Sequence, residues 1–128
     1  KMYDAEDQNV IDTVTGVIRK IACDGNCIIV GRAANIASID IPRHLSIKLQ
    51  APLEWRIHRI MKISNMAYIE AQTYIQSIDN ERDLFVEHIA SRKLENSDFD
   101  MVFNYATMSD DHIVDAIVNV AKNKKIIL

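Results

Sequence analysis

The stretch Cys27-Ile28-Ile29-Val30-Gly31-Arg32 decides the fold, because an apolar run ends abruptly at a glycine that is followed by an arginine. Four consecutive apolar residues after the turn-forming Asp24-Gly25-Asn26 predict a strand that is buried on both faces, as in a parallel sheet. Residues just past the carboxyl end of such a strand lie where open α/β sheets bind ligands. The pattern therefore places Arg32 at a candidate anion site.

Composition and charge exclude several classes of function. A chain of 128 residues, 48% of them hydrophobic, is long enough for one globular domain with a core, or for a piece of one. A net charge of −3 gives no general attraction to nucleic acid, so we expect no nucleic-acid partner. No apolar run is long enough to span a membrane, and Cys23 and Cys27 are too few for a disulfide framework. We expect a cytoplasmic protein with reduced thiols and no membrane partner.

The hydrophobic pattern alternates along the chain between the period of a helix and that of a strand. Helices are predicted at 7–22, after Pro52, over 67–89 and after the N-cap Ser109. Strands are predicted at 27–30, 44–50 and 99–105. This order predicts an α/β fold, a partial doubly wound and mainly parallel sheet that is flanked by helices.

Three strands make a thin sheet, because a parallel strand needs neighbours and cover on both faces. The pattern indicates the second half of a larger doubly wound domain whose first strands lie elsewhere. Strand exchange in a homodimer is the other way to complete the sheet. None of the three glycines is followed by lysine, so the sequence holds no G-x-x-x-x-G-K-[ST] loop to cradle a nucleotide's phosphates.

A row of cations projects from the helix that a proline opens. Arg56, Arg59 and Lys62 recur at three-residue intervals, on a side away from the apolar positions. They could bind an anion, or they could form an ordinary solvated face that pairs with Glu54 or Glu70. Trp55 on the same helix is expected to serve packing or to be a partly buried surface aromatic. The four histidines lack metal-ligand spacing, so no metal site is predicted.

Four segments together suggest a family: Ile28-Ile29-Val30-Gly31-Arg32-Ala33-Ala34, Ala51-Pro52-Leu53-Glu54-Trp55-Arg56-Ile57-His58-Arg59-Ile60-Met61, Ile78-Asp79-Asn80-Glu81-Arg82 and Asp98-Phe99-Asp100-Met101-Val102-Phe103-Asn104. In this order they resemble the carboxyl-terminal portion of the cytidylate kinase-like family, within the P-loop nucleoside monophosphate kinases. The resemblance covers about Asp7 to Lys122. It implies that 1–128 is a single domain of this kind, or a fragment of one, with a lid at about 64–97.

The resemblance implies phosphoryl transfer from ATP to a nucleoside monophosphate, with Mg²⁺. Arg32 would contact the acceptor monophosphate, and Arg56 and Arg59 would bind ATP. Arg59 would also act in catalysis together with Arg82, which would close over the transferred phosphoryl group from the lid. Arginine suits these roles because its planar fork binds two phosphate oxygens at once and keeps its charge.

The resemblance is to a portion that lacks the family's glycine loop, with its lysine and its magnesium-holding serine or threonine. These 128 residues alone are therefore not expected to catalyse the reaction. Two interpretations without a catalytic role stay open as well. Arg82 could pair with Asp79 on one helix. The chain could also be a noncatalytic module without a P-loop, which binds nucleotides or anions or assembles dimers.

Overall fold

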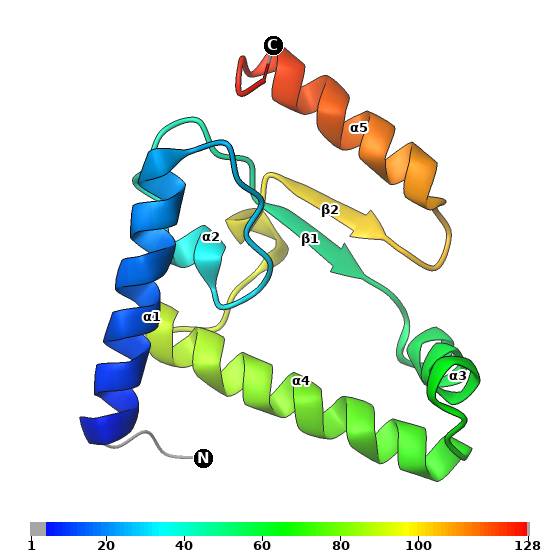
Figure 1. The fold of residues 1–128 in the computed structure, drawn as a ribbon. Helices are drawn as coiled ribbons and strands as arrows, with labels where there is room; N and C mark the ends of the chain where they lie inside the picture. The colour runs from blue at the N-terminus through cyan, green and yellow to red at the C-terminus, as the bar shows by residue number, and fades with distance from the viewer. Residues whose placement is uncertain (1–4, 128) are drawn as a thin grey trace. The chain divides into compact units, whose positions relative to one another are not determined.

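The computed structural model describes residues 5–127, which form two compact units (Figure 1). Unit 1 consists of the chain up to Pro42 together with Glu81–Leu94. Unit 2 consists of Arg43–Asn80 together with the chain from Glu95 onward. The long helix α4 (Tyr68–Ala90) contributes residues to both units and confirms the helix predicted over 67–89.

Unit 1 is built around α1 (Ala5–Asp24), which confirms the helix predicted at 7–22, and the short helix α2 (Ala34–Ala37). The apolar stripe of α1 buries Ile11 and Ile18. Arg19 links α1 to the end of α2. Its guanidinium donates to the Ala37 carbonyl at 2.7 Å and to the two carboxylate oxygens of Asp40 at 2.7 and 3.1 Å. These charge-assisted bonds hold the segment after α2 against α1.

The strand predicted at 27–30 is wrong. These residues run as an irregular segment between α1 and α2, where Ile28 is 94% exposed and Val30 is 87% exposed. Gly31, Arg32 and Ala33 follow with φ angles of 74°, 57° and 54°, a left-handed turn into α2. Among residues 5–127 both strands lie in unit 2 and pair with each other, so this apolar run has no ladder to join.

Unit 2 contains a two-stranded parallel sheet, formed by β1 (Ile47–Gln50) and β2 (Met101–Asn104). Ile47 is paired with Met101, and the register continues to Gln50 and Asn104. The sheet confirms the two later predicted strands and their parallel direction. A 3₁₀ turn, η1 (Asn96–Asp98), precedes β2, and α5 (Asp110–Asn123) begins after the predicted N-cap Ser109. The chain is thus a mixed α/β protein; that it is half of a P-loop kinase-like domain stays a prediction.

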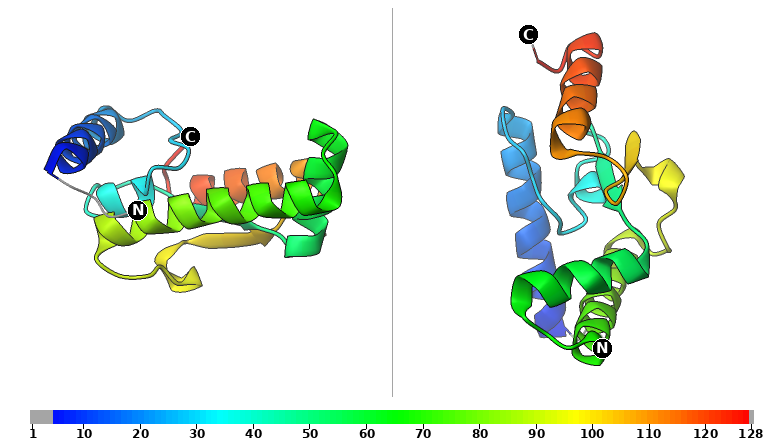
Figure 2. Two further views of the ribbon diagram at one scale, coloured as in Figure 1. Left: turned by 90° about the horizontal axis from the view of Figure 1, so that it is seen from below. Right: turned by 90° about the vertical axis from the view of Figure 1, so that its right-hand side faces the viewer.

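Helix α3 (Leu53–Ser64) and the first part of α4 form a helix–turn–helix pair in which the two helices cross rather than run side by side (Figure 2). Pro52 stands at the N-cap, one position before the expected first turn, and Asn65 ends α3 with a φ of 53°. Ile57 and Ala71 are completely buried where the helices meet, and Ile75 is 3% exposed. This small core fixes the face of α3 that carries the basic residues.

Candidate functional site

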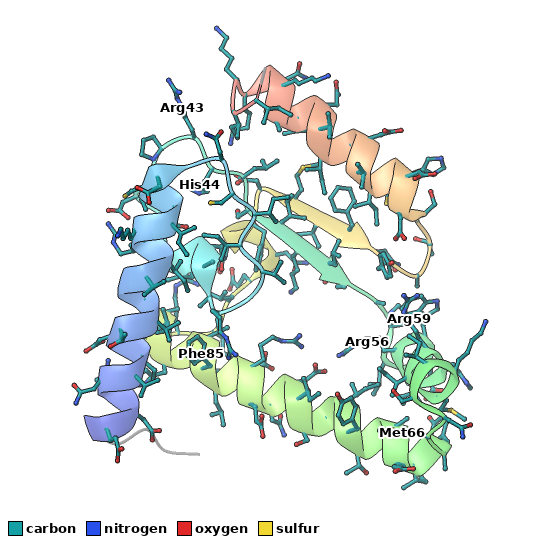
Figure 3. The ribbon with its side chains drawn as sticks, in the orientation of Figure 1. Arg43, His44, Arg56, Arg59, Met66 and Phe85 are labelled. Carbon is teal, nitrogen blue, oxygen red and sulfur yellow. The ribbon has the colours of Figure 1, made fainter. Side chains whose placement is uncertain are left out.

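The candidate site lies where β1 and β2 end. Because the strands are parallel, their carboxyl ends meet at one edge of the sheet, the edge at which α/β proteins bind ligands. Only two residues separate the end of β1 from the start of α3, so the first two turns of α3 carry Arg56 and Arg59 at this edge (Figure 3). The residue that follows β2 is Tyr105. All of these positions belong to unit 2.

Arg59 lies beside a pair of aromatic rings that contact each other. Its guanidinium carbon is 5.2 Å from the centroid of the Trp55 ring and 5.2 Å from the centroid of the Tyr105 ring. The rings meet edge to face, with centroids 5.7 Å apart and planes at 89°. Both distances fit cation–π attraction, which holds the cation without neutralising it. Arg59 itself is exposed, so its charge remains accessible to an anion.

Tyr105 is held in turn by the start of α5. Its hydroxyl donates to Oδ1 of Asp110 at 2.6 Å, and this hydrogen bond raises the pKa of the Tyr105 phenol. Asp110 is fixed because it opens α5, where the Ser109 hydroxyl accepts a hydrogen bond from the His112 N–H at 3.2 Å. Sequence reasoning missed Tyr105 and gave Trp55 a packing role only. The available signal was the position of Tyr105 at the carboxyl end of the strand predicted at 99–105.

Arg56 on α3 forms a bidentate ion pair with a carboxylate on α4. Its two terminal nitrogens donate to the two carboxylate oxygens of Asp79, each at 2.7 Å. The side chains are 31% and 26% exposed, and the hydrogen bonds to Asp79 raise the pKa of Arg56. A solvated face paired with Glu54 or Glu70 is therefore wrong for Arg56. Asp79 supplies that partner from α4 instead.

A polar hollow of about 540 Å³ adjoins the Arg56–Asp79 pair. It is lined by Ala51, Leu53, Arg56, Gln76, Asp79 and Asn80. The start of α3 forms one wall, and one face of α4 forms the other. A larger hollow of about 720 Å³ runs along the start of α4, between Met66 and Ser77, but its lining is mainly apolar and holds none of the predicted site residues.

The other two predicted site residues belong to unit 1. Arg32 is exposed on the left-handed turn before α2, and Arg82 is exposed on α4. The structure thus brings Arg56 and Arg59 onto one helix at the edge of the sheet. The convergence of Arg32 and Arg82 with Arg59 over one pocket remains a prediction, as do the catalytic roles of Arg59 and Arg82 and the lid at 64–97.

No group of three or more His, Cys, Asp or Glu side chains within residues 5–127 is placed to hold a metal ion. Cys23 and Cys27 are both free, and both are exposed. Over the same part of the chain, no helix combines the length and the apolar character that crossing a membrane requires.

Comparison with known proteins bears on this arrangement. Residues 2–107 match the cytidylate kinase-like family. The chain belongs to the cytidylate kinase-like family. This confirms the resemblance drawn from the sequence, and the matched residues include all four predicted site arginines and Tyr105, whereas Asp110 lies beyond them.

A crystal structure of an uncharacterized protein from Eubacterium ventriosum has a similar fold, with a TM-score of 0.80 and 19% sequence identity. The similarity covers 91% of this chain and 66% of that chain, so this member of the family spans about two thirds of the length of its structural neighbour. At this identity the likeness shows the fold alone. No curated protein matches the sequence.

Proposed function

We propose that this chain is the nucleotide-binding portion of a kinase that transfers a phosphoryl group from ATP to a nucleoside monophosphate such as CMP. Membership of the cytidylate kinase-like family suggests a nucleotide kinase-like function. The observation that carries the proposal is the exposed Arg59 guanidinium, held beside the rings of Trp55 and Tyr105 at the carboxyl edge of the sheet.

Phosphoryl transfer asks a protein mainly to position phosphates and to offset their spreading negative charge. Arg59 is suited to this because the flanking rings restrict its side chain and leave its donors accessible. The rings also offer an apolar surface of the kind on which bases stack. A cation beside such a surface matches the two parts of ATP, the triphosphate and the base. Arg56, one turn earlier, would bind a second phosphate oxygen.

The remaining roles follow the family. Arg32 would bind the acceptor monophosphate, and Arg82 would act with Arg59 on the transferred group when the lid closes. Mg²⁺ would balance the charge of the ATP phosphates. The glycine loop and lysine of the family have no counterpart in these 128 residues, so the active protein must obtain them from elsewhere.

A noncatalytic module is the second candidate, and the lack of a G-x-x-x-x-G-K-[ST] motif in the sequence favours it. Such a module would use the same edge of the sheet to bind a nucleotide or another anion, without transferring a phosphoryl group. It could also assemble as a homodimer. The two candidates differ in turnover rather than in binding, so they are separated by an assay of both.

The test is titration calorimetry of the chain with MgATP and with CMP, followed by an assay of ADP formation from ATP with CMP, dCMP or UMP. We expect Arg59→Ala to weaken ATP binding about tenfold or more, as loss of a charge-assisted contact does. Lys122→Ala, which removes an exposed cation from α5, is the matched control. Binding without ADP formation, in a preparation that contains the glycine loop, favours the module. An unmutated chain that binds neither MgATP nor CMP overturns the proposed nucleotide-binding portion of a kinase, and a module that binds another anion or assembles dimers then stays as the candidate.

A further inference from the structure

Asp79 occupies both terminal nitrogens of Arg56, one of the edges through which a guanidinium binds a phosphate. We propose that Asp79 is a specificity-determining residue of the nucleotide site, a gate that holds Arg56 in an ion pair until a polyphosphate displaces it. This inference rests on the proposed function, because it concerns the same site. It distinguishes how the two arginines of α3 are held, whereas the family resemblance assigns ATP binding to both.

The geometry of the pair is that of two planar groups meeting fork to fork. Both terminal nitrogens of Arg56 are engaged at 2.7 Å, and both oxygens of Asp79 accept. A phosphate binds arginine through the same fork, so carboxylate and phosphate compete for it. While the pair is closed, the charge of Arg56 is offset at close range. Arg59 differs, because aromatic rings flank it and leave its charge in place.

The hollow beside the pair provides room for the exchange. Arg56 and Asp79 both line it, together with Gln76 and Asn80 on the adjoining turns of α4. With the pair closed, the hollow contains one positive and one negative group, and it does not attract an anion strongly. When Arg56 turns to a phosphate, the side-chain amides of Gln76 and Asn80 offer N–H donors to the carboxylate that is left behind.

The gate predicts selectivity for charge. A singly or doubly charged anion competes poorly with a bidentate carboxylate that is tethered in place, since the tether keeps the local concentration of the carboxylate high. A triphosphate can anchor on Arg59 first and then compete for Arg56 with a second group. The closed pair should therefore favour triphosphates over orthophosphate and over nucleoside monophosphates at this edge of the sheet.

The test is calorimetric titration with inorganic tripolyphosphate and with orthophosphate. Asp79→Asn keeps the shape of the side chain and removes its charge, and we expect it to tighten tripolyphosphate binding about fivefold and to narrow the preference over orthophosphate. Asp83→Asn removes an exposed carboxylate one turn further along α4 and is expected to change binding less than about twofold. Adding Arg56→Gln to Asp79→Asn should abolish the gain, because the gain depends on the released arginine.

A measurement on the unmutated chain guards against a variant that fails to fold. The side-chain Nε resonance of Arg56 should shift when the chain is saturated with tripolyphosphate, and an unchanged resonance overturns the gate. Tripolyphosphate binding that Asp79→Asn leaves unchanged or weakens also overturns it, as does a gain that survives the Arg56→Gln change. If the unmutated chain binds neither tripolyphosphate nor MgATP, the proposed function fails and the gate fails with it. If the unmutated chain binds tripolyphosphate and Asp79→Asn binds it with the same affinity, the gate is overturned and the proposed function stands.

Discussion

Ser46 and Asp100 tie together the amino ends of β1 and β2. The backbone N–H and the hydroxyl of Ser46 both donate to Oδ2 of Asp100, at 2.8 and 3.0 Å, and the Asp100 N–H donates to the Ser46 carbonyl at 2.9 Å. The Nζ atom of Lys124 is 3.8 Å from the other carboxylate oxygen of Asp100, Oδ1. The pair lies at the end of the sheet opposite the candidate site, so it fixes the register of the strands without contributing to ligand binding.

The first prediction concerns acid. The hydrogen bond from the Ser46 backbone N–H, the largest cause, lowers the pKa of Asp100 below its ordinary value. A carboxyl whose pKa is depressed by folding stabilises the protein above its unfolded pKa of about 4, and this contribution is lost as the pH falls through the lower folded pKa. Asp100→Asn should cost about 0.5–1 kcal/mol at pH 7, a figure that allows for screening of a side chain that is 39% exposed.

Urea unfolding near neutral pH and again in acid measures this difference. The gap between the unmutated chain and Asp100→Asn should close as the carboxyl is protonated. Asp115→Asn, at an exposed position of α5, is the control and should leave the stability nearly unchanged. A gap that stays constant from neutral pH to acid would contradict the role given to the ionised Asp100.

The second prediction concerns the small core between α3 and α4. Ile57 is completely buried between α3 and α4, so Ile57→Ala should lower the free energy of unfolding by about 2–5 kcal/mol through lost burial and the cavity left behind. Ile63 on the same helix is 65% exposed, and Ile63→Ala should change it by about 0.5 kcal/mol or less. Comparable losses in the two variants, measured by urea unfolding, would show that α3 does not pack on α4 through this face.

The third prediction separates the ring of Tyr105 from its hydroxyl. Tyr105→Phe keeps the ring beside Arg59 and loses the hydrogen bond to Asp110, so ATP affinity should fall about two- to threefold. Tyr105→Leu removes the aromatic face as well, and the loss should be larger by about fivefold. Titration calorimetry with MgATP compares them. Equal losses in the two variants would mean that the ring itself contributes nothing to the site.

The fourth prediction concerns the acceptor. Arg32→Ala should weaken CMP binding about tenfold to a hundredfold and leave ATP binding unchanged, because a charge-assisted contact to one phosphate is lost. Lys20→Ala removes an exposed cation from α1 in the same unit and serves as the control. Titration with CMP that shows the same affinity for Arg32→Ala and the unmutated chain would exclude Arg32 from the acceptor site.

The fifth prediction is a dependence on salt. If Arg59 binds the phosphates of ATP from an exposed position, raising the ionic strength from about 0.05 M to 0.3 M should weaken binding severalfold through charge screening. The slope should be smaller for Arg59→Ala, which has one cation fewer at the site. Affinity that is indifferent to salt in the unmutated chain would make Arg59 a surface residue rather than a ligand.

Sequence reasoning succeeded where the pattern itself determines the structure. Helix α1 follows from its apolar stripe, α5 from its N-cap Ser109, and the two paired strands from apolar residues bounded by turn and polar residues. The strand prediction at 27–30 failed because apolar side chains favour burial in any backbone conformation. A strand also requires a neighbouring strand whose backbone groups can pair with its own. Nothing in the run itself indicates whether that neighbour is present.

The candidate site was predicted in part, for a similar reason. The spacing of Arg56 and Arg59 predicted that both project from one helix, and the structure shows that this helix starts close to the carboxyl end of β1. Their partners could not be predicted, because Asp79 is 23 residues from Arg56 in the sequence and Tyr105 reaches Arg59 from another element. Spacing within a helix indicates which residues share a face. It does not indicate what packs opposite.

The bare aliphatic side chains of Ile28 and Val30 have a consequence for handling the protein. Exposed apolar surface of this kind promotes association in water. The purified protein should therefore bind hydrophobic dyes and should aggregate as ammonium sulfate is added. Exchanging these two side chains for threonine would keep their branched shape and make the preparation better behaved, without touching any arginine.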